Sequence, residues 1–245
     1  YGGAPCRRAP PAPVWGWRWF GPMDCLRMGR WGAAALAGLG LALPVGAAPP
    51  LPALEPGPPL RCGGTGLVSL LELAPRPLVE LRYASPYNVL QATLYPRIDP
   101  RLRCPVALAL QRVQQELARE GLGLKVWDAY RPLAVQQRMW EAIRDPRYVS
   151  DPAVNAGRHT RGTAVDLTLV DRRGRELPMP TDFDDFSEAA HQNAPGISAE
   201  RAANARRLRV VMERHGFLAF PTEWWHFDWR GWEGLAPIEE SPGGG

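Results

Sequence analysis

Hydrophobic and polar positions follow a helical period in three stretches of the chain. Between residues 105 and 121, apolar side chains recur at helical spacing, with a proline in the first turn and a glycine where a helix would stop. Residues 133–143 have a similar pattern, and so do residues from about 198 to 215, followed by Gly216. We therefore predict three helices, the first of them amphipathic and packed on a core.

Alternation with a period of two predicts strands elsewhere. Residues 122–128 alternate and lead to a proline stop, so Arg131 should lie just beyond a strand end. Residues 163–170 alternate cleanly, with Asp166 and Thr168 on the face opposite the apolar residues. Two further segments are predicted as a strand followed by a loop and as an aromatic-rich final strand: residues 78–90 and 222–230. Strands and helices mix without a regular repeat, so we expect an α+β fold with a largely antiparallel sheet.

The first 48 residues differ in pattern from the rest of the chain. A basic residue after Met28, an apolar run of small residues and leucine, and a small-x-small site ending at Ala47 are typical of a secretory signal peptide. The run is too short and glycine-broken to favour stable membrane insertion. We expect residues 1–48 to be a spurious leader plus signal peptide, and the mature protein to be periplasmic or secreted.

Composition changes mark the remaining boundaries. Residues 49–66 are rich in proline and glycine and are predicted to be a linker. We expect one folded domain over residues 67–235, followed by a flexible tail over residues 236–245. The net charge of +4 is spread along the chain and does not form a patch, so we predict no nucleic-acid partner. The sequence carries no signal for an oligomeric state.

Two of the four cysteines, Cys62 and Cys104, lie in the predicted mature chain. In an oxidising compartment a pair of cysteines favours a disulfide, and two buried free thiols are the alternative. Zinc ligation by these residues is not indicated, because no CxxC pair occurs.

The candidate chemistry lies in two short motifs. His159 and Asp166 flank a turn at Gly162 that lets the backbone fold back, so the two side chains can converge. His226 follows Glu223 by three residues. Two imidazoles and one carboxylate would leave a tetrahedral zinc ion one open position for water, as a catalytic site requires. A nearby glutamate can then act as general base.

Each of these residues alone has a simpler structural interpretation. A single histidine beside a strand is commonly a satisfied structural residue, and His215 fits a favourable cation at a helix C-terminus. Glu223 and His226 fall on opposite faces of an ideal strand. The catalytic interpretation therefore needs a bend or bulge, or a turn after Pro221 that contains Glu223.

Three motifs taken together resemble a known family. "HTRGTAVDLTL", "EWWHF" and "DAYRP" are similar to the zinc D-alanyl-D-alanine dipeptidases of the VanX type. That family lies within a wider group of DD- and LD-carboxypeptidases that share HxxGxAxD and a later ExxH. The resemblance covers roughly residues 67–230, and it implies a DD-peptidase/hedgehog-like fold with a zinc site at a central sheet flanked by helices.

Carried over position by position, the resemblance implies roles for individual residues. His159, Asp166 and His226 would bind one zinc ion per chain. Glu223 would be the catalytic base, and Arg131 would stabilise the oxyanion of the tetrahedral intermediate.

Two further residues match positions that the family uses around the free amino group of the substrate, Tyr83 and Asp184, with Asp185 left as an alternative. Simpler interpretations stay open: Arg131 could pair with Asp128 at the surface, and Asp184 could cap a helix. One position departs from the family, because Gly157 stands where a serine commonly helps to hold the substrate.

The expected function is zinc-dependent hydrolysis of D-alanyl-D-alanine, or a similar small D,D-dipeptide, in cell-wall peptide turnover. One alternative is a D,D- or L,D-carboxypeptidase that trims longer peptidoglycan stems. Another is a non-catalytic module that binds zinc or cell wall. Glu223 argues against the module, because a binding site has no use for a base.

Overall fold

The computed structural model describes residues 60, 62, 66–95 and 99–238. The predicted leader and signal peptide lie outside the described residues, as do most of the predicted linker and residues 239–245 of the predicted tail. Among the helices of the described part, none has the length and apolar character needed to cross a membrane.

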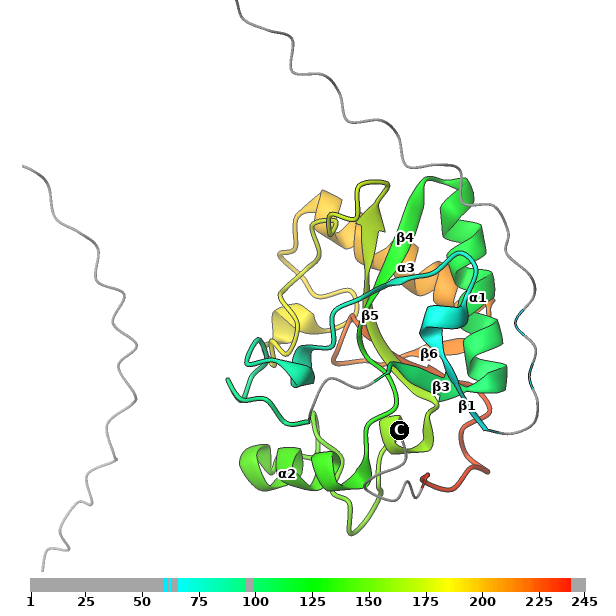
Figure 1. Cartoon of the computed structure of the whole chain (residues 1–245). Coiled ribbons are helices and arrows are strands. Elements are labelled where there is room, and N and C mark those ends of the chain that lie inside the picture. The colour runs from blue at the N-terminus through cyan, green and yellow to red at the C-terminus, as the bar shows by residue number, and fades with distance from the viewer. Residues whose placement is uncertain (1–59, 61, 63–65, 96–98, 239–245) are drawn as a thin grey trace, which may run out of the picture. The chain divides into compact units, whose positions relative to one another are not determined.

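A five-stranded sheet forms the centre of the described domain (Figure 1). Its order is β2-β4-β5-β7-β6, and only the β2–β4 pair is parallel. The prediction of a largely antiparallel sheet is therefore confirmed. The strands span Leu78–Val79 (β2), Leu122–Asp128 (β4), Ala164–Asp171 (β5), Phe217–Ala219 (β6) and His226–Trp229 (β7).

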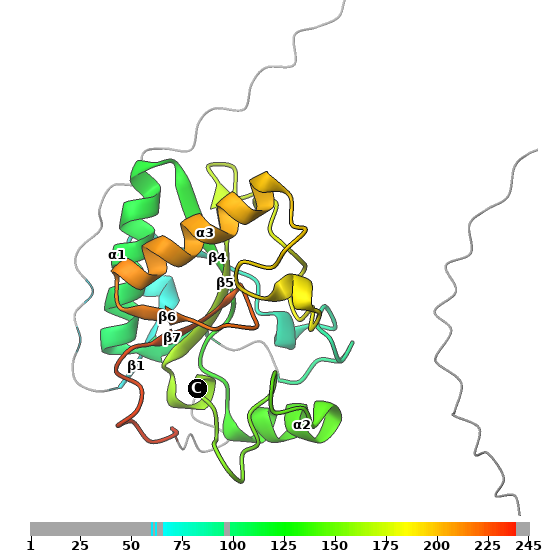
Figure 2. The same cartoon turned by 180° about the vertical axis from the view of Figure 1, so that it is seen from behind.

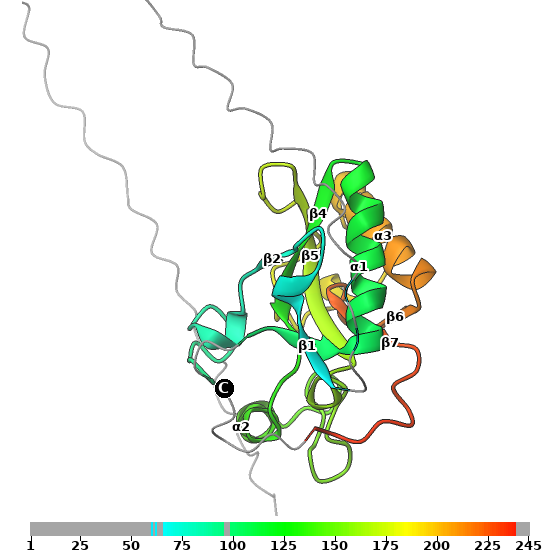
Figure 3. The same cartoon turned by 45° about the vertical axis from the view of Figure 1, so that its right-hand side comes forward.

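Two long helices cover one face of this sheet, as the views in Figure 2 and Figure 3 show: α1 (Cys104–Arg119) and α3 (Ala199–Arg214). The apolar residues of β5 are fully buried in the core, which gains about 25 cal/mol for each Å² of apolar surface removed from water. The third helix, α2 (Leu133–Ile143), belongs to a second, smaller apolar cluster. All three helices lie within two residues of their predicted bounds.

Shorter elements complete the described domain. A separate two-stranded antiparallel sheet is formed by β1 (Leu67–Ser69) and β3 (Arg101–Arg103). Single turns of 3₁₀ helix occur at Leu70–Glu72, Arg82–Ala84, His159–Arg161 and Glu188–Ala190. The three-residue strands β1, β3 and β6 were not predicted, because so few residues cannot establish an alternating pattern.

Two predicted strands are shorter than expected. The segment predicted over residues 78–90 pairs only at Leu78–Val79 and then turns into 3₁₀ helix. The final strand, predicted over residues 222–230, begins at His226. Residues 221–225 form turns instead, because the carbonyl of Pro221 accepts from Gln192 N–H and Trp224 N–H donates to the carbonyl of Ala190. Within this segment, the Trp225 carbonyl still accepts from Leu167 N–H of β5, next to the start of β7.

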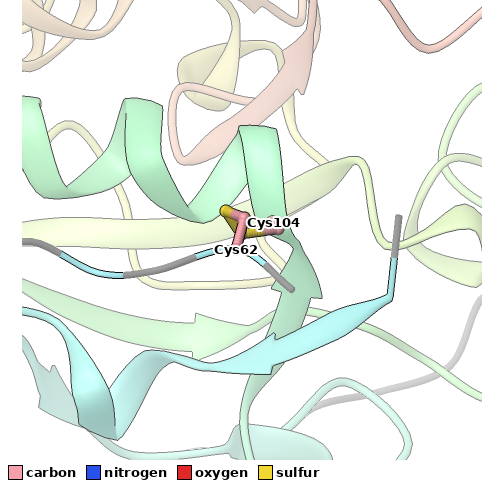
Figure 4. Close-up of a disulfide and its surroundings, with 2 residues drawn as sticks. All are labelled: Cys62 and Cys104. Carbon is pink, nitrogen blue, oxygen red and sulfur yellow. A yellow bond between two sulfur atoms is a disulfide. The ribbon is translucent and has the colours of Figure 1, made fainter. Parts of the chain in front are cut away.

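Cys62 and Cys104 form a disulfide, with Cα atoms 5.7 Å apart (Figure 4). Cys104 is the first residue of α1, so the bridge ties the segment before β1 to the start of the main core helix. The prediction of a bridge is confirmed over its alternative of two free thiols.

Candidate metal centre and active site

A row of polar side chains crosses the central sheet on the face opposite α1 and α3. Asp128 of β4 lies opposite Asp166 of β5, which in turn lies opposite His226 of β7. The β4–β5 register shifts between Val126 and Asp128, so Trp127 is an extra residue at this point. Without the bulge, Asp128 would lie on the same face of β4 as Val126, which pairs with Leu167. The bulge turns Asp128 to the other face, where it pairs with Asp166 and joins the row.

His159 reaches the same row from the turn before β5. It begins a 3₁₀ turn that ends at Gly162, which has a φ of 65° and donates its N–H to the carbonyl of His159. The left-handed conformation favours glycine, and a Cβ at Gly162 would lie 2.7 Å from a terminal side-chain carbon of Leu67, which would have to move. The predicted convergence of His159 and Asp166 around this turn is confirmed.

The three predicted metal ligands present their donor atoms to one point. His226 Nδ1 lies 2.9 Å from Asp166 Oδ1 and 3.2 Å from His159 Nε2, which is 3.4 Å from the same Asp166 oxygen. Ligands at about 2.0–2.1 Å from a tetrahedral ion are separated by roughly 3.3 Å. All three residues are buried, and their spacing therefore fits a zinc ion.

In each imidazole, the nitrogen that faces away from the candidate metal site has a hydrogen-bond partner of its own. His159 Nδ1 lies 2.7 Å from the carbonyl oxygen of Ala129, which can only accept, so this nitrogen must donate. His226 Nε2 lies 2.9 Å from Asp228 Oδ1 and donates in the same way. The lone pairs of the inner nitrogens consequently face each other and the carboxylate, which is the arrangement that metal-binding histidines commonly show.

The protonation of this cluster reflects its buried charges. Burial raises the pKa of Asp166, but His159 and His226 lower it by more, so the net pKa is well below the usual value. Burial lowers the pKa of His226, while Asp228 and Asp166 raise it above its ordinary value. Without a metal, a proton on His226 relieves the crowding of lone pairs, and a divalent cation can take the place of that proton.

Glu223 lies in the turn before β7, as the catalytic interpretation required. Its Oε2 is 3.7 Å from His226 Nδ1, and the side chain is buried. Burial raises the pKa of Glu223 to about 8. A carboxyl group with a pKa near neutrality is well suited to exchange a proton at working pH.

Arg131 follows the end of β4 and is 6% exposed, so the alternative of a surface pair is wrong. The pair with Asp128 exists, but it is buried: Arg131 Nε and Nη2 both donate to Asp128 Oδ2, at 2.9 and 2.6 Å. Nη1 donates to Gln136 Oε1 at 2.8 Å, and Nη2 lies 4.0 Å from Asp166 Oδ2. These contacts fix the guanidinium group beside the candidate metal site.

Asp184 and Tyr83 form a second polar pair in the same pocket. The Tyr83 hydroxyl donates to Asp184 Oδ1 at 2.8 Å, and Val89 N–H donates to Oδ2 at 3.2 Å. Burial raises the pKa of Asp184 to about 7. The alternative that Asp184 caps a helix is wrong. Asp185 instead accepts from the N–H of Ser187 and does not line the pocket.

All seven predicted site residues line one cavity of about 50 Å³, together with Gly157 and Arg158 among others. Larger hollows of about 730 and 690 Å³ lie elsewhere in the described domain, and none of the predicted metal ligands lines them. The chemistry therefore gathers in a narrow cavity that suits a small ligand.

Asp128 and Asp228 support the site from behind. The sequence indicated Asp128 only as an alternative surface partner of Arg131, and it did not indicate Asp228. Asp228 accepts from His226, and Asp128 holds Arg131 and lies 3.6 Å from His159 Nδ1. Asp228 follows His226 by two residues in a strand, and that spacing places both on one face. This signal could have identified Asp228. Asp128 could not be placed in advance, because its orientation depends on the bulge.

Comparison with known proteins identifies relatives of the whole domain. The family profile described as D-ala-D-ala dipeptidase matches residues 64–236. The D-alanyl-D-alanine dipeptidase of Escherichia coli is 36% identical over 164 residues, which cover 67% of this chain and 84% of the relative. The enzyme of the same name from Enterococcus faecium is 36% identical over 140 residues, covering 50% of this chain and 69% of the relative.

Two solved structures show weaker likeness. One is the vancomycin resistance D,D-pentapeptidase VanY in complex with Zn(II), with 18% identity, a TM-score of 0.35 and coverage of 55% of this chain and 76% of that one. The other is the LD-carboxypeptidase LdcB, with 19% identity, a TM-score of 0.39 and coverage of 57% and 64%.

Proposed function

The chain belongs to the D-ala-D-ala dipeptidase family, and on that basis we propose that it is a zinc peptidase that hydrolyses D-alanyl-D-alanine or a similar D,D-dipeptide. The observation that carries the proposal is the convergence of His159, Asp166 and His226 on one point, at distances that suit a tetrahedral ion. Three protein ligands leave one position open for water or substrate, as catalytic zinc sites require.

Bound zinc would act as a Lewis acid toward the peptide carbonyl and would lower the pKa of a water molecule to about 7. Glu223 takes a proton from the attacking water and passes it to the leaving amine. The raised pKa of about 8 suits a group that must both accept and donate in one turnover. Arg131, fixed by Asp128 and Gln136, is placed to stabilise negative charge that develops on the carbonyl oxygen.

Tyr83 and Asp184 bind the amino group of the dipeptide in this proposal. An ammonium group beside Asp184 would favour the ionised carboxylate, whose pKa burial raises in the free protein. The Tyr83 hydroxyl donates to the same carboxylate and holds it in one orientation. A buried carboxylate at this end favours a free amino terminus over a longer stem peptide, which would place an uncharged amide there.

The proposal is tested by metal analysis and hydrolysis assays on one purified sample. We expect about one zinc per chain, hydrolysis of D-Ala-D-Ala that is lost with chelator, and recovery when zinc is restored. Hydrolysis of only an amino-blocked or longer stem peptide would establish the carboxypeptidase alternative. Zinc binding without hydrolysis of either substrate would establish the non-catalytic module.

We also propose that the mature protein acts outside the cytoplasm. The predicted signal peptide motivates this, and the Cys62–Cys104 disulfide supports it, because such bridges persist mainly in oxidising compartments. A dipeptide met there would be released cell-wall material. Fractionation of expressing cells, with mass analysis of the processed chain, should recover protein that begins at Ala48 in the exported fraction. Uncleaved protein confined to the cytoplasm would contradict the proposal.

A further inference from the structure

Arg158 lines the catalytic cavity but has no place in the chemistry proposed so far. It lies between Gly157 and His159, and its side chain is 25% exposed, so it is neither fully buried nor free in solvent. Among the described residues that line the cavity, Arg131 is the other arginine. Arg131 has another role in the proposed chemistry, at the carbonyl oxygen, and three of its N–H groups already donate to Asp128 and Gln136.

Three contacts hold the Arg158 guanidinium in place. Its Nε lies 3.3 Å from Asp228 Oδ2, and its Cζ lies 4.6 Å from the ring centre of Trp232 and 5.9 Å from that of Phe220. Asp228 and the aromatic rings therefore orient the group by an ion pair and by cation–π contacts. The Nε contact with Asp228 is an ion pair without a hydrogen bond. In the described part of the chain, no hydrogen bond engages either terminal nitrogen of Arg158, so both can donate to a ligand.

The charge of the cavity defines what these donors can bind. Asp166, Asp184 and Glu223 line it together with Arg131 and Arg158, so a carboxylate of a ligand is best placed beside one of the two arginines. A dipeptide carries such a group at its carboxyl terminus. Gly157 offers no hydroxyl to a ligand, whereas the guanidinium fork of Arg158, the next residue, matches a carboxylate in a bidentate manner.

Asp184 and Arg158 line the cavity from separate segments of the chain. Asp184 contacts Tyr83 and Val89, whereas Arg158 contacts Asp228 and the rings of Phe220 and Trp232. The candidate metal ligands His159 and His226 line the same cavity, and His226 shares Asp228 with Arg158. We propose that Arg158 binds the C-terminal carboxylate of the dipeptide. With Asp184 at the amino end, the site then recognises both termini and so measures the length of its substrate.

This inference rests on the proposed function, and a pair of substrates tests it. D-Ala-D-Ala and its C-terminal amide differ only in the group that Arg158 would bind. We expect Arg158→Ala in the zinc-loaded protein to lower kcat/KM for D-Ala-D-Ala by about 10- to 100-fold, mainly through KM, because a hydrogen-bonded charge contact is lost. Hydrolysis of the amide should change by less than about 3-fold, and Arg158→Lys should recover part of the loss.

Arg161→Ala is the matched control. Arg161 lies in the same turn and contacts the same Trp232 ring, with Cζ 5.8 Å from its centre, but it does not line the cavity. It should leave the acid-to-amide preference unchanged. Zinc content is measured for every variant, because Arg158 also contacts Asp228 behind His226. Equal loss on both substrates, or an unchanged preference in Arg158→Ala, would overturn the inference.

A binding measurement separates this inference from the proposed function. Glu223→Gln serves as a slow host, and calorimetry compares its affinity for D-Ala-D-Ala and for the amide, with and without Arg158→Ala. Weaker binding of the acid alone supports the carboxylate contact. If the unaltered protein hydrolyses both substrates and the host binds both with equal affinity, only the inference about Arg158 fails. If the unaltered protein neither binds nor hydrolyses D-Ala-D-Ala, both proposals fail.

Discussion

The pKa values of carboxyl groups are shifted in opposite directions in two parts of the catalytic cavity, which we call its floor and its wall. On the floor, Asp166 of β5 lies between two imidazoles, and its pKa is held well below the usual value. On the wall, Glu223 and Asp184 project from loops, and their pKa values are raised to about 8 and about 7.

Burial does not explain this difference, because the three carboxylates are 3%, 6% and 9% exposed. The partners explain it. Asp166 has two basic groups within hydrogen-bond distance or close to it. Among the described residues, the donors to Asp184 are the neutral Tyr83 hydroxyl and Val89 N–H, and Glu223 has its histidine at 3.7 Å. A compensated carboxylate suits a metal ligand, and an uncompensated one suits a proton carrier or a partner for an ammonium group.

Removal of the floor carboxylate should have the largest effect. Asp166→Ala leaves two imidazoles, so we expect zinc to be lost on dialysis and hydrolysis to fall to the background rate. Thr168→Val is the control, because Thr168 lies on the same face of β5 and is equally buried. Metal analysis and the dipeptide assay measure both. Retention of one zinc per chain by Asp166→Ala would contradict the assignment of the floor.

Glu223→Gln, a substitution in the wall, should separate catalysis from zinc binding by the floor. The amide cannot take a proton, so we expect kcat to fall by about 10²- to 10⁴-fold while zinc content stays unchanged. Kinetics and metal analysis on the same preparation measure the two effects. Loss of zinc together with activity would show that Glu223 belongs with the metal ligands.

The wall should also make the metal-free protein sensitive to high pH. Asp184 keeps a proton up to about pH 7 in the folded chain but loses it near pH 4 when unfolded, so its contribution to stability is lost as pH rises between these values. Between pH 5 and pH 8 we expect the contribution of Asp184 to lower the free energy of unfolding by about 3 kcal/mol, at roughly 1.4 kcal/mol per pH unit up to the folded pKa. The floor behaves oppositely, since the contribution of Asp166 is lost as pH falls.

Urea unfolding in the presence of chelator, at pH 5 and pH 8, measures this effect. The free energy of unfolding of Asp184→Asn, minus that of the unaltered protein, should be larger at pH 8 than at pH 5. A difference between the two proteins that is the same at both pH values would show that Asp184 does not titrate in this range.

The smallest effect is expected for a wall substitution that changes substrate binding, measured as KM. Asp184→Asn should raise KM for D-Ala-D-Ala by about 10- to 100-fold and keep zinc, because a contact between charged groups is worth about 1.5–3 kcal/mol. Asp185→Asn is the control, since its carboxylate accepts only from Ser187 N–H in the described structure. Equal effects of the two substitutions would mean that Asp184 does not contact the amino group.

The sequence predicted the floor better than the wall. The alternation of residues 163–170 and the turn at Gly162 are local features, and both occur as expected. The wall lies in loops whose hydrogen bonds join distant segments, such as Tyr83 with Asp184. No local pattern indicates such a pair, so Tyr83 and Asp184 entered through family resemblance, whereas Glu223 was indicated by its spacing to His226.

By itself, the sequence determined which residues could carry the chemistry and that His159 and Asp166 could converge, because seven residues and a glycine turn are a local constraint. Only the tertiary structure decided that His226 joins them and that Asp128 and Asp228 support them. Those contacts depend on the register between strands and on one bulge in β4. Register is set by packing across the whole sheet, which no short segment of the chain contains.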